Sequence, residues 1–357
     1  MENLQAANPP AATPEPQTAT LKAKHRLEPG DRFPDFMLAD QTRMVSAFYQ
    51  RVRGRGMAVF IDSDATLRRS LREFGDGYRS AQLDCLVIDG AASEVDAEPR
   101  ILMDEAGRIR ESVREMSGHP VGPGGARPFA FLLDRNQRIL AVAAEGDLAA
   151  WALDRWSQEP ALTASDVVRH AAPVLTVPNV LSREDCQALI ARWHAEGHEP
   201  GYVTSMVKGE QVLRIYEDLK KRRDHRLADP AVRQPLMAMI ARRISPELSK
   251  AFFYGSFKFD RVLIACYDAE RGDYFRRHRD NSTPTTTGRR FALTLNLNSE
   301  EYDGGELVFP EYGDYRYKPP TGAAVLFSCS LLHEALPVTC GQRFALLSFL
   351  RDPDDKR

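Results

Sequence analysis

The 357-residue sequence has few cysteines and no CxxC pair among them. Its five cysteines are scattered and odd in number, which argues against a disulfide framework and against a zinc ribbon. No run approaches the ~20 apolar residues that span a bilayer. Residues 1–24 lack the apolar core of a secretory signal. We therefore expect a cytoplasmic protein with no membrane segment.

Net charge is also nearly absent from this chain. Its 48 basic side chains are balanced by 50 acidic ones, and no long block of either sign stands out. Nonspecific binding to nucleic acid needs a basic field, so we expect no nucleic-acid partner. Hydrophobic residues make up 43% of the chain, which at this length is enough for two separate cores.

The composition of the chain changes after a short N-terminal leader. Residues 1–24 are rich in Ala, Pro, Thr and Gln, which offer little to bury, so we predict that they are disordered. Residues 25–156 alternate apolar runs of strand length with a helical pattern at Leu67, Leu71 and Phe74. This alternation predicts an α/β domain with a partly parallel sheet. The strand segments are "MAVFID", "LDCLVID", "RILMD", "FAFLLD" and "RILAVA", with a hairpin turn at 134–136 joining the last two.

Residues 157–172 are expected to link this domain to a second one at 173–357. The second domain opens with a helical segment that has Ser182 as its N-cap and ends at Gly197. A further helical stretch, "AVRQPLMAMIARRISPELSKAFF", is expected to break at Pro246. The rest of the chain is a series of short β segments separated by turn residues, which predicts a sandwich or jelly-roll barrel.

Side chains that can bind a metal stand in an ordered pattern within this β-rich region. His278 and Asp280 are one residue apart, so on a strand they would share a face while Arg279 points away. His333 follows 55 residues later. Two histidines and one carboxylate form the facial triad of non-haem Fe(II) oxygenases. Arg343, ten residues after His333, could pair with the far carboxylate of a dicarboxylate cosubstrate.

Each part of this pattern has an ordinary explanation when it is taken alone. An isolated His-x-Asp usually binds nothing, and a lone histidine is more often a surface or hydrogen-bonded core residue. A zinc hydrolase could use similar ligands, although the sequence has no HExxH helix and no evident general-base glutamate beside them. The specific feature is the order of His-x-Asp, a β-rich interval with a Gly-Gly turn, and then His with Arg ten residues on.

The segments "IACYDAERGDYFRRHRDNS", "LTLNLNSEEYDGGELVFPEYG" and "YKPPTGAAVLFSCSLLHEALPVTCGQRFALLSFL" resemble the prolyl 4-hydroxylase-like branch of the Fe(II)/2-oxoglutarate dioxygenases. The resemblance covers about residues 174–351. It implies an α+β domain with a double-stranded β-helix, a jelly roll flanked by helices. It also implies that His278, Asp280 and His333 are iron ligands and that Arg343 binds the distal carboxylate of 2-oxoglutarate.

The same resemblance assigns other residues to the pocket. Tyr267 matches a tyrosine, on the strand before the His-x-Asp, that lines the cosubstrate pocket. Asn296 stands roughly where oxygen-sensing relatives have a tyrosine that touches the distal carboxylate. Gly304 and Gly305 match a turn whose role is backbone geometry. Phe275 is expected to pack near the iron as a wall.

Several charged positions around these motifs are ambiguous. We expect Arg289 to lie at the surface, whereas Arg290 could either hold an anionic substrate or lie at the surface too. Arg276 and Arg277 are expected to be solvated by default, although one of them could line the entrance. The charged segment 204–227 could be a solvated loop and helix or, as related enzymes imply, a lid over the substrate.

The N-terminal segments "LEPGDRFPDFMLADQTRMVSAFYQRVRGRGMAVFID" and "RPFAFLLDRNQRI" resemble a peroxiredoxin, which has a thioredoxin-like fold. Peroxidase chemistry needs a thiolate at the start of the helix that follows the first core strand. The sequence there reads "FIDSDATLRRS" and has no cysteine, while Cys85 lies in an apolar strand where a thiol is usually inert. The resemblance implies a thioredoxin-like domain without peroxidase activity. It could dock a partner, hold substrate, support a homodimer or be a structural appendage.

Together these features predict a dioxygenase that hydroxylates an unactivated C–H bond of a prolyl or amino-acid-like substrate and releases succinate and CO₂. The expected cofactors are Fe(II), 2-oxoglutarate and O₂, with ascorbate as an accessory reductant. The substrate could be a small molecule or a peptide. The alternative is a non-peroxidatic thioredoxin-like interaction module carrying an oxygenase that modifies a protein partner. The missing cysteine disfavours a thiol peroxidase, and the intact ligand set disfavours a non-catalytic barrel.

Overall fold

The computed structural model describes residues 26–51, 54–90, 100–121, 125–160, 167, 170–207, 210–215 and 218–355. The chain divides into two compact units. One comprises the residues up to Glu28 together with Phe33–Pro160, and the other comprises Pro29–Arg32 and the chain from Ala161 onward. The leader expected at 1–24 and most of the linker expected at 157–172 lie outside the described residues.

The first unit is built on a seven-stranded mixed sheet in the order β2-β1-β5-β4-β3-β6-β7. Strand β4 runs parallel to both β3 and β5, whereas β6 is antiparallel to both β3 and β7. This confirms the expected α/β sheet with a partly parallel centre. The strands are β1 (Met37–Asp40), β2 (Val45–Ala47), β3 (Gly56–Ile61), β4 (Leu83–Asp89), β5 (Arg100–Met103), β6 (Phe129–Leu133) and β7 (Ile139–Ala143).

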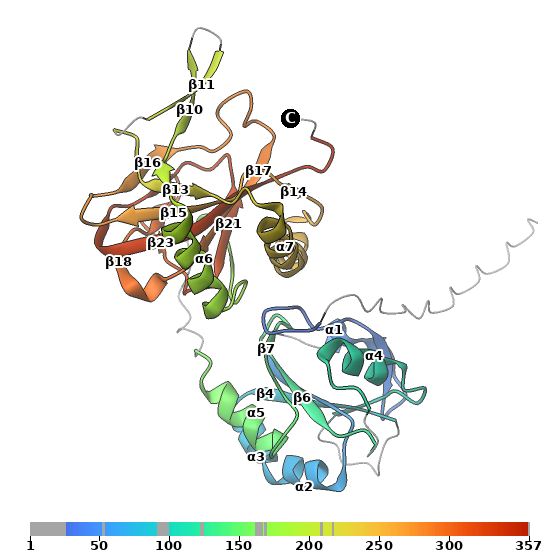
Figure 1. Cartoon of the computed structure of the whole chain (residues 1–357). Helices are drawn as coiled ribbons and strands as arrows, with labels where there is room; N and C mark the ends of the chain where they lie inside the picture. Colours follow the sequence, from blue (N-terminus) through green and yellow to red (C-terminus); the bar gives the residue numbers. More distant parts are fainter. Residues whose placement is uncertain are drawn as a thin grey trace, which may run out of the picture. The chain divides into compact units, whose positions relative to one another are not determined.

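Helices cover both faces of this sheet, as Figure 1 shows. Successive side chains of the fully buried strand β3 point to opposite faces, so Val59 packs with Val113 of α4 while Phe60 packs with Leu67 of α2. Both sides of the sheet are therefore core, which explains why its strands read as continuous apolar runs. The helices are α1 (Phe48–Arg51), α2 (Ala65–Glu73), α3 (Gly75–Ser80), α4 (Arg108–Ser117) and α5 (Leu148–Ser157).

The second unit contains two main sheets. The larger runs in the order β8-β21-β17-β23-β15-β13-β9, and β14 and β18 also pair with β23. The smaller runs in the order β12-β16-β22-β19-β20. The strands of the larger sheet are β8 (Leu175–Val177), β9 (Glu199–Pro200), β13 (Arg223–Arg226), β14 (Lys258–Phe259), β15 (Leu263–Asp268), β17 (Arg289–Asn296), β18 (Tyr302–Gly304), β21 (Ala324–Ser328) and β23 (Val338–Arg351). Those of the smaller sheet are β12 (Lys220–Lys221), β16 (Tyr274–His278), β19 (Leu307–Val308), β20 (Arg316–Tyr317) and β22 (His333–Ala335).

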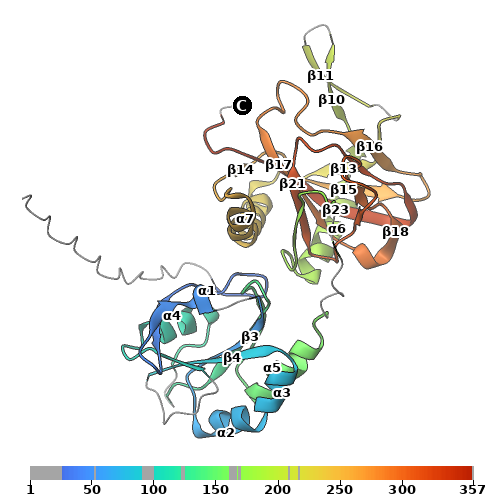
Figure 2. The same ribbon diagram turned by 180° about the vertical axis from the view of Figure 1, so that it is seen from behind.

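The two sheets of the second unit share one core. Ala265 and Val325 from the larger sheet pack in the same apolar cluster as Leu307 and Ala335 from the smaller one. On its other face the larger sheet is covered by α6 (Arg183–Glu196) and α7 (Pro230–Phe252), as the two opposite views show (Figures 1 and 2). This layered, sheet-rich arrangement agrees with the coarse prediction for the second domain, while its winding as a jelly roll stays a prediction.

The two helices match the sequence reading at one site and differ from it at another. Ser182 and Asp185 form a capping box at the start of α6, and Gly197 ends it, as expected. The expected break at Pro246 is wrong, because α7 continues through it. Burial of Ile244 and Leu248 against the larger sheet stabilises the helix across the hydrogen bond that proline cannot make.

Two further strands complete the second unit. β10 (Val203–Val207) and β11 (Glu210–Arg214) form a separate antiparallel hairpin. The short 3₁₀ helix η1 (Ser299–Glu301) lies just before β18. No helix in the described part of the chain is long and apolar enough to cross a membrane.

Candidate active site

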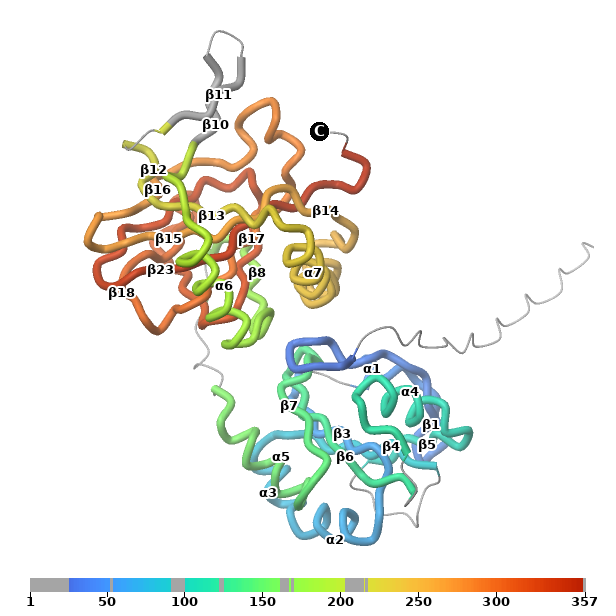
Figure 3. Tube along the Cα trace, in the orientation of Figure 1, coloured from blue at the N-terminus to red at the C-terminus, as the bar shows by residue number. Residues whose placement is uncertain are grey.

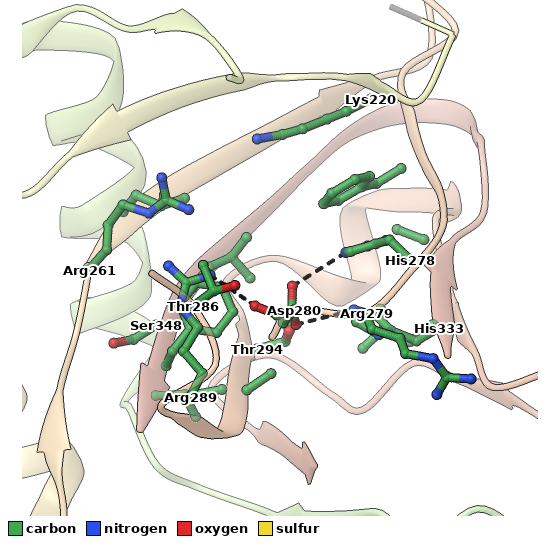
Figure 4. A pocket seen from close by; sticks show the side chains of 18 of the residues that line it. Lys220, Arg261, His278, Arg279, Asp280, Thr286, Arg289, Thr294, His333 and Ser348 are labelled. Carbon is green, nitrogen blue, oxygen red and sulfur yellow. Dashed lines mark hydrogen bonds and ion pairs between the residues drawn. The ribbon is translucent and has the colours of Figure 1, made fainter. Parts of the chain in front are cut away.

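The structure brings the three expected metal ligands together. His278 is the last residue of β16, Asp280 lies in the turn that follows, and His333 opens β22. One possible ligand atom of each lies within 4.8 Å of the others. The Nε2 atoms of His278 and His333 lie 3.4 Å from different oxygens of the Asp280 carboxylate (Figure 4). We refer to these three residues as the triad.

The backbone holds the triad in a way that differs from a simple strand. The expectation that one strand carries both His278 and Asp280 is wrong, because β16 ends at His278. The turn is held instead by the Asp280 amide, which donates to the carbonyl of Cys329 over 3.0 Å. Arg279 forms an ion pair with Glu311, with 2.7 Å between its Nη2 and a carboxylate oxygen. Its guanidinium is therefore engaged away from the triad, as expected.

Hydrogen bonds set the tautomer of both histidines. The Nδ1 atom of His278 lies 2.7 Å from the carbonyl oxygen of Arg276, and that of His333 lies 3.0 Å from the carbonyl oxygen of Leu331. A carbonyl oxygen can only accept, so each Nδ1 carries the proton and donates. Each Nε2 is left facing Asp280, and an Nδ1–H bonded to a backbone carbonyl is the arrangement that metal-binding histidines show.

The electrostatics of the triad favour the protonation states that bind a metal. Burial alone would raise the pKa of Asp280, but His333 and His278 outweigh it and hold that pKa at about 2. Burial lowers the pKa of His333 to about 4, although the Asp280 carboxylate opposes the shift. A carboxylate and a neutral imidazole are therefore present at neutral pH, as metal coordination requires.

Aromatic rings fix the two imidazoles. Phe275 stacks on His278 with 3.5 Å between ring centroids, and Phe327 meets His333 edge-on at 4.7 Å. The expectation that Phe275 forms a wall beside the ligands agrees with this contact. Both imidazoles are thus held by packing as well as by their hydrogen bonds.

Arg343 lies on β23 beside Tyr267 of β15, its direct partner across the sheet. Only 2% of Arg343 is exposed, yet its Nε and Nη1 atoms have no hydrogen-bond partner among the described residues. Its guanidinium carbon lies 5.1 Å from the centroid of the Tyr267 ring. A buried cation without a counter-ion is costly, so this position is suited to an anionic ligand.

The Gly-Gly turn makes room for this arginine. Gly304 and Gly305 have φ values of +74° and +67°, which residues other than glycine rarely adopt. A Cβ atom on Gly305 would lie 3.0 Å from the Cδ of Arg343 and from the Cγ2 of Val338. The turn therefore supplies both the backbone geometry that was expected and space beside Arg343.

A cavity of about 180 Å³ joins these parts, and its lining includes the triad, Tyr267, Phe275 and Arg343. Asn296 is not part of that lining. The Asn296 amide nitrogen instead donates to the hydroxyl of Ser299 over 3.0 Å and to the carbonyl of Pro319 over 3.1 Å, in the turn after β17. The expectation that Asn296 contacts the cosubstrate is therefore corrected, because its donors serve that turn.

Of the two arginines at the start of β17, Arg289 is placed contrary to expectation, and Arg290 takes one of the two positions left open for it. Arg289 lines the cavity and pairs with Asp260 over 2.9 Å. Arg290 is exposed and pairs with Asp352 over 2.6 Å. Arg289 is thus the member of the pair that is near the site, and Arg290 lies at the surface.

The sequence reading missed two basic residues in the site. Lys220 of β12 is 3% exposed, and its Nζ donates to the carbonyl of Tyr202 over 2.9 Å and to Asp224 over 3.2 Å. Arg222 donates to the Tyr267 hydroxyl over 2.7 Å. Figure 3 shows β12 beside β16, which carries His278. The alternation of Lys220, Arg222 and Asp224 was the available signal, since residues two apart in an extended segment point to the same side.

The first unit offers no thiol at the position where peroxidase chemistry would need one. Strand β3 is followed by Asp62, which is buried and ion-paired with Arg110 and Arg114. Asp64 then caps α2 by accepting from the amide of Leu67. Cys85 lies within β4 and is free and partly buried. A carboxylate held by two guanidiniums thus follows the strand where a peroxiredoxin would require a thiolate.

Comparison with known proteins agrees with the geometry of the triad. Residues 262–351 match the family model described as the 2OG-Fe(II) oxygenase superfamily. A "PKHD-type hydroxylase" of Synechococcus sp. is 36% identical over 105 residues, which cover 27% of this chain and 46% of that relative. Another, from Burkholderia cenocepacia, is 27% identical over 202 residues, covering 51% of this chain and 82% of the relative. The chain thus spans about half the length of the first of these relatives.

Two solved structures are also similar to parts of this chain. A Pseudomonas putida prolyl-4-hydroxylase is 25% identical, with a TM-score of 0.39, and the match covers 52% of this chain and 94% of the other. The peroxidoxin BcpB of Mycobacterium tuberculosis is 16% identical, with a TM-score of 0.32, and the match covers 38% of this chain and all of the other. These similarities are too distant to carry an argument.

The family match and the site geometry meet in one stretch of chain. The matched residues include Tyr267, the whole triad and Arg343. The name of the family contains Fe(II) and 2-oxoglutarate (2OG). The triad could bind the metal, and Arg343 could bind a carboxylate of 2-oxoglutarate. Residues 262–351, which hold the triad, therefore match the 2OG-Fe(II) oxygenase superfamily in sequence and carry a site that fits this match.

Proposed function

We propose that the protein is an Fe(II)- and 2-oxoglutarate-dependent dioxygenase that hydroxylates an unactivated C–H bond of a prolyl or other amino-acid-like substrate. One observation carries this proposal. Two imidazole Nε2 atoms and a carboxylate converge in a cavity that also contains Arg343, a buried guanidinium with unpartnered nitrogens. The triad is suited to a divalent metal, and Arg343 is suited to a carboxylate.

The donor set fits iron, and the rest of the cavity argues against a zinc hydrolase. Two imidazoles and one carboxylate would also suit catalytic zinc. A hydrolase needs a general base near the metal, whereas the cavity lining contains no carboxylate other than Asp280 among the described residues. It contains arginines instead, and a 2-oxo dicarboxylate would use a buried guanidinium at its far end.

When bound, Fe(II) and 2-oxoglutarate supply the activation of O₂: one oxygen atom goes to succinate, the other enters the C–H bond as a hydroxyl, and CO₂ leaves. The chain's own residues position these partners. Nδ1–H bonds to backbone carbonyls hold the imidazoles of His278 and His333 in one orientation. Arg343 would donate to the distal carboxylate of the cosubstrate, with the Tyr267 ring packed beside it. Phe275 and Phe327 exclude water from the faces of the imidazoles.

The first unit would then serve the oxygenase without redox chemistry of its own. Asp62, ion-paired with Arg110 and Arg114, follows the strand after which a peroxiredoxin would need its thiolate. This supports a thioredoxin-like module without peroxidase activity, and its docking of a partner or of a protein substrate stays a prediction. The resemblance of this unit to a peroxiredoxin remains a prediction. The same holds for the homodimer, the cytoplasmic location and the use of ascorbate.

The proposal is tested by incubating the full chain with Fe(II), 2-oxoglutarate and ascorbate, and measuring succinate with and without candidate substrates. The candidates are free amino acids, prolyl peptides and small metabolites. We expect slow succinate formation alone and faster formation with the correct substrate, coupled to a mass gain of one oxygen in that substrate. Absence of turnover across the panel, together with absence of iron binding, would refute the proposal.

A further inference from the structure

A second arginine without a partner lines the cavity. Arg261 is partly buried, and its Nε is inaccessible and has no hydrogen-bond partner. Among the described residues, nothing forms a hydrogen bond or an ion pair with its guanidinium. Figure 4 shows Arg261 entering the cavity from the side opposite His333. The proposed function gives this arginine no role.

Arg261 and Arg343 approach the cavity from different ends. Arg261 lies two residues before β15, in the alternating row that continues through Leu263, Ala265 and Tyr267 along the core between the sheets. Tyr267 is the direct strand partner of Arg343. At about 3.3 Å per residue, the six residues from Arg261 to Tyr267 span roughly 20 Å of backbone. One small dicarboxylate held by the triad and Arg343 would therefore leave Arg261 unused.

The charges near Arg261 do not neutralise it. Burial lowers the pKa of Arg261, and the like charges of Arg289 and Arg222 act in the same direction. Two carboxylates lie near, and each is already shared by two other cations: Asp224 by Lys220 and Arg222, and Asp260 by Arg289 and Arg351. The neighbourhood therefore has an excess of positive charge, which an anionic group from outside the chain would balance.

We propose that Arg261 binds a carboxylate of the primary substrate, at a subsite separate from the one that holds 2-oxoglutarate. This inference rests on the proposed function, because there the two carboxylates of 2-oxoglutarate are taken by the metal and by Arg343. One free guanidinium balances one negative charge, and its planar fork matches a carboxylate in a bidentate pair.

The unbalanced positive charge at Arg261 matches a substrate that carries one carboxylate. The substrate class is therefore a carboxylate-bearing amino-acid derivative.

The test is calorimetric titration of the full chain loaded with Mn(II) and 2-oxoglutarate, a state that binds without turnover. Binding of Mn(II) and of 2-oxoglutarate is measured first. The probes are N-acetyl-L-amino acids as free acids, the same compounds as primary amides, and O-phospho-N-acetylserine amide. The variants are Arg261→Gln and Arg261→Lys, with Arg183→Gln as the control because Arg183 is exposed on α6 and pairs only with Glu300 among the described residues.

We expect at least one acid to bind about tenfold or more tightly than its amide, the loss expected when a charge-assisted hydrogen bond is removed. Arg261→Gln should abolish that preference and leave Mn(II) and 2-oxoglutarate affinities unchanged. Arg261→Lys should retain part of it, and Arg183→Gln all of it. If circular dichroism shows that Arg261→Gln does not fold, the Arg261→Lys variant decides the question. It must then lower the affinity for the acid at least threefold and leave the affinity for the amide unchanged.

Four results would overturn the subsite. They are equal binding of acids and amides, no binding of any acid, tighter binding of the phosphomonoester, and a loss of 2-oxoglutarate affinity on replacing Arg261. The last of these would place Arg261 in the cosubstrate site. Failure of the wild-type chain to bind Mn(II) and 2-oxoglutarate would instead contradict the proposed function. A failure of the subsite and a failure of the proposed function are therefore distinguishable.

Discussion

Tyr267 and Arg343 are direct partners across the antiparallel strands β15 and β23, and the guanidinium lies 5.1 Å from the centre of the aromatic ring. The pair forms one wall of the cavity that contains the triad. Arg222 holds the tyrosine from the other side through its hydroxyl. The arginine is thus positioned by an aromatic face and left without an acid, which is the basis for its assignment to the cosubstrate.

Replacing Arg343 by glutamine should weaken 2-oxoglutarate binding and leave metal binding intact. Removal of one partner of a buried charge pair costs about 2–5 kcal/mol, so the dissociation constant should rise at least about 30-fold. Calorimetry of the Mn(II)-loaded chain measures both quantities, with Arg183→Gln as the control. An unchanged affinity for 2-oxoglutarate would exclude Arg343 from the cosubstrate site.

Replacing Gly305 by alanine should damage the site more than the same change at Gly272. Both glycines have positive φ, +67° and +64°, so both variants carry the same backbone strain of about 1 kcal/mol. Only at Gly305 would the new Cβ lie 3.0 Å from the Cδ of Arg343, whereas nothing lies within 4 Å at Gly272. Gly305→Ala should therefore weaken 2-oxoglutarate binding several-fold and Gly272→Ala should not. Equal affinities in the two variants would show that the turn does not position Arg343.

Replacing Tyr267 by phenylalanine should act mainly on stability. The change removes the hydroxyl that accepts from buried Arg222 but keeps the ring beside Arg343. An unsatisfied buried donor costs about 1–3 kcal/mol, so the free energy of unfolding in urea should fall by that amount. The affinity for 2-oxoglutarate should change less than threefold. A large loss of that affinity with no loss of stability would mean that the hydroxyl contacts the cosubstrate directly.

Lys220 gives the protein a dependence on pH. Burial and the nearby Arg222 lower the pKa of Lys220 from 10.5 to about 7, although Asp224 opposes the shift. Between these values the unfolded chain binds a proton that the folded chain does not, so this residue's contribution to stability is lost as the pH falls from 10.5 to 7. Lys220→Met removes that titration.

The Lys220→Met variant should therefore gain stability relative to the wild type as the pH falls through that window, by about 2–4 kcal/mol. Urea unfolding at pH 7 and pH 9.5 measures the difference. The more exposed neighbour gives the control variant, Lys221→Met. A difference that is the same at both pH values would show that Lys220 keeps its proton in the folded chain.

Much of the site could be read from the sequence because its parts lie in short, rigid segments. The triad is recognisable from His-x-Asp and a downstream histidine, since the two segments must meet on neighbouring strands, and β16 and β22 do pair. The Gly-Gly turn is equally local, because positive φ selects glycine. Asn296 was misassigned because the sequence predicts which strand a residue lies on, but it does not predict how far the cavity extends along that strand.

The arginines were harder to place because their positions depend on strand register. A β-bulge between Arg289 and Phe291 breaks the alternation of faces, so period-two reasoning could not tell which of Arg289 and Arg290 points inward. Arg261 lies outside any strand, and its lack of a partner follows only from how β12, β13 and β15 come together. Such properties are tertiary, and no local pattern encodes them.

The most direct test of the central claim is an anaerobic titration of the full chain with Fe(II) and then 2-oxoglutarate, followed by visible absorption. A 2-oxo acid that chelates Fe(II) through its keto and carboxylate oxygens gives a charge-transfer band that neither component gives alone. We expect this band in the wild type and its absence in His278→Ala, which removes one ligand of the triad. No band in a folded wild-type chain saturated with both components would contradict the assignment of the triad and Arg343.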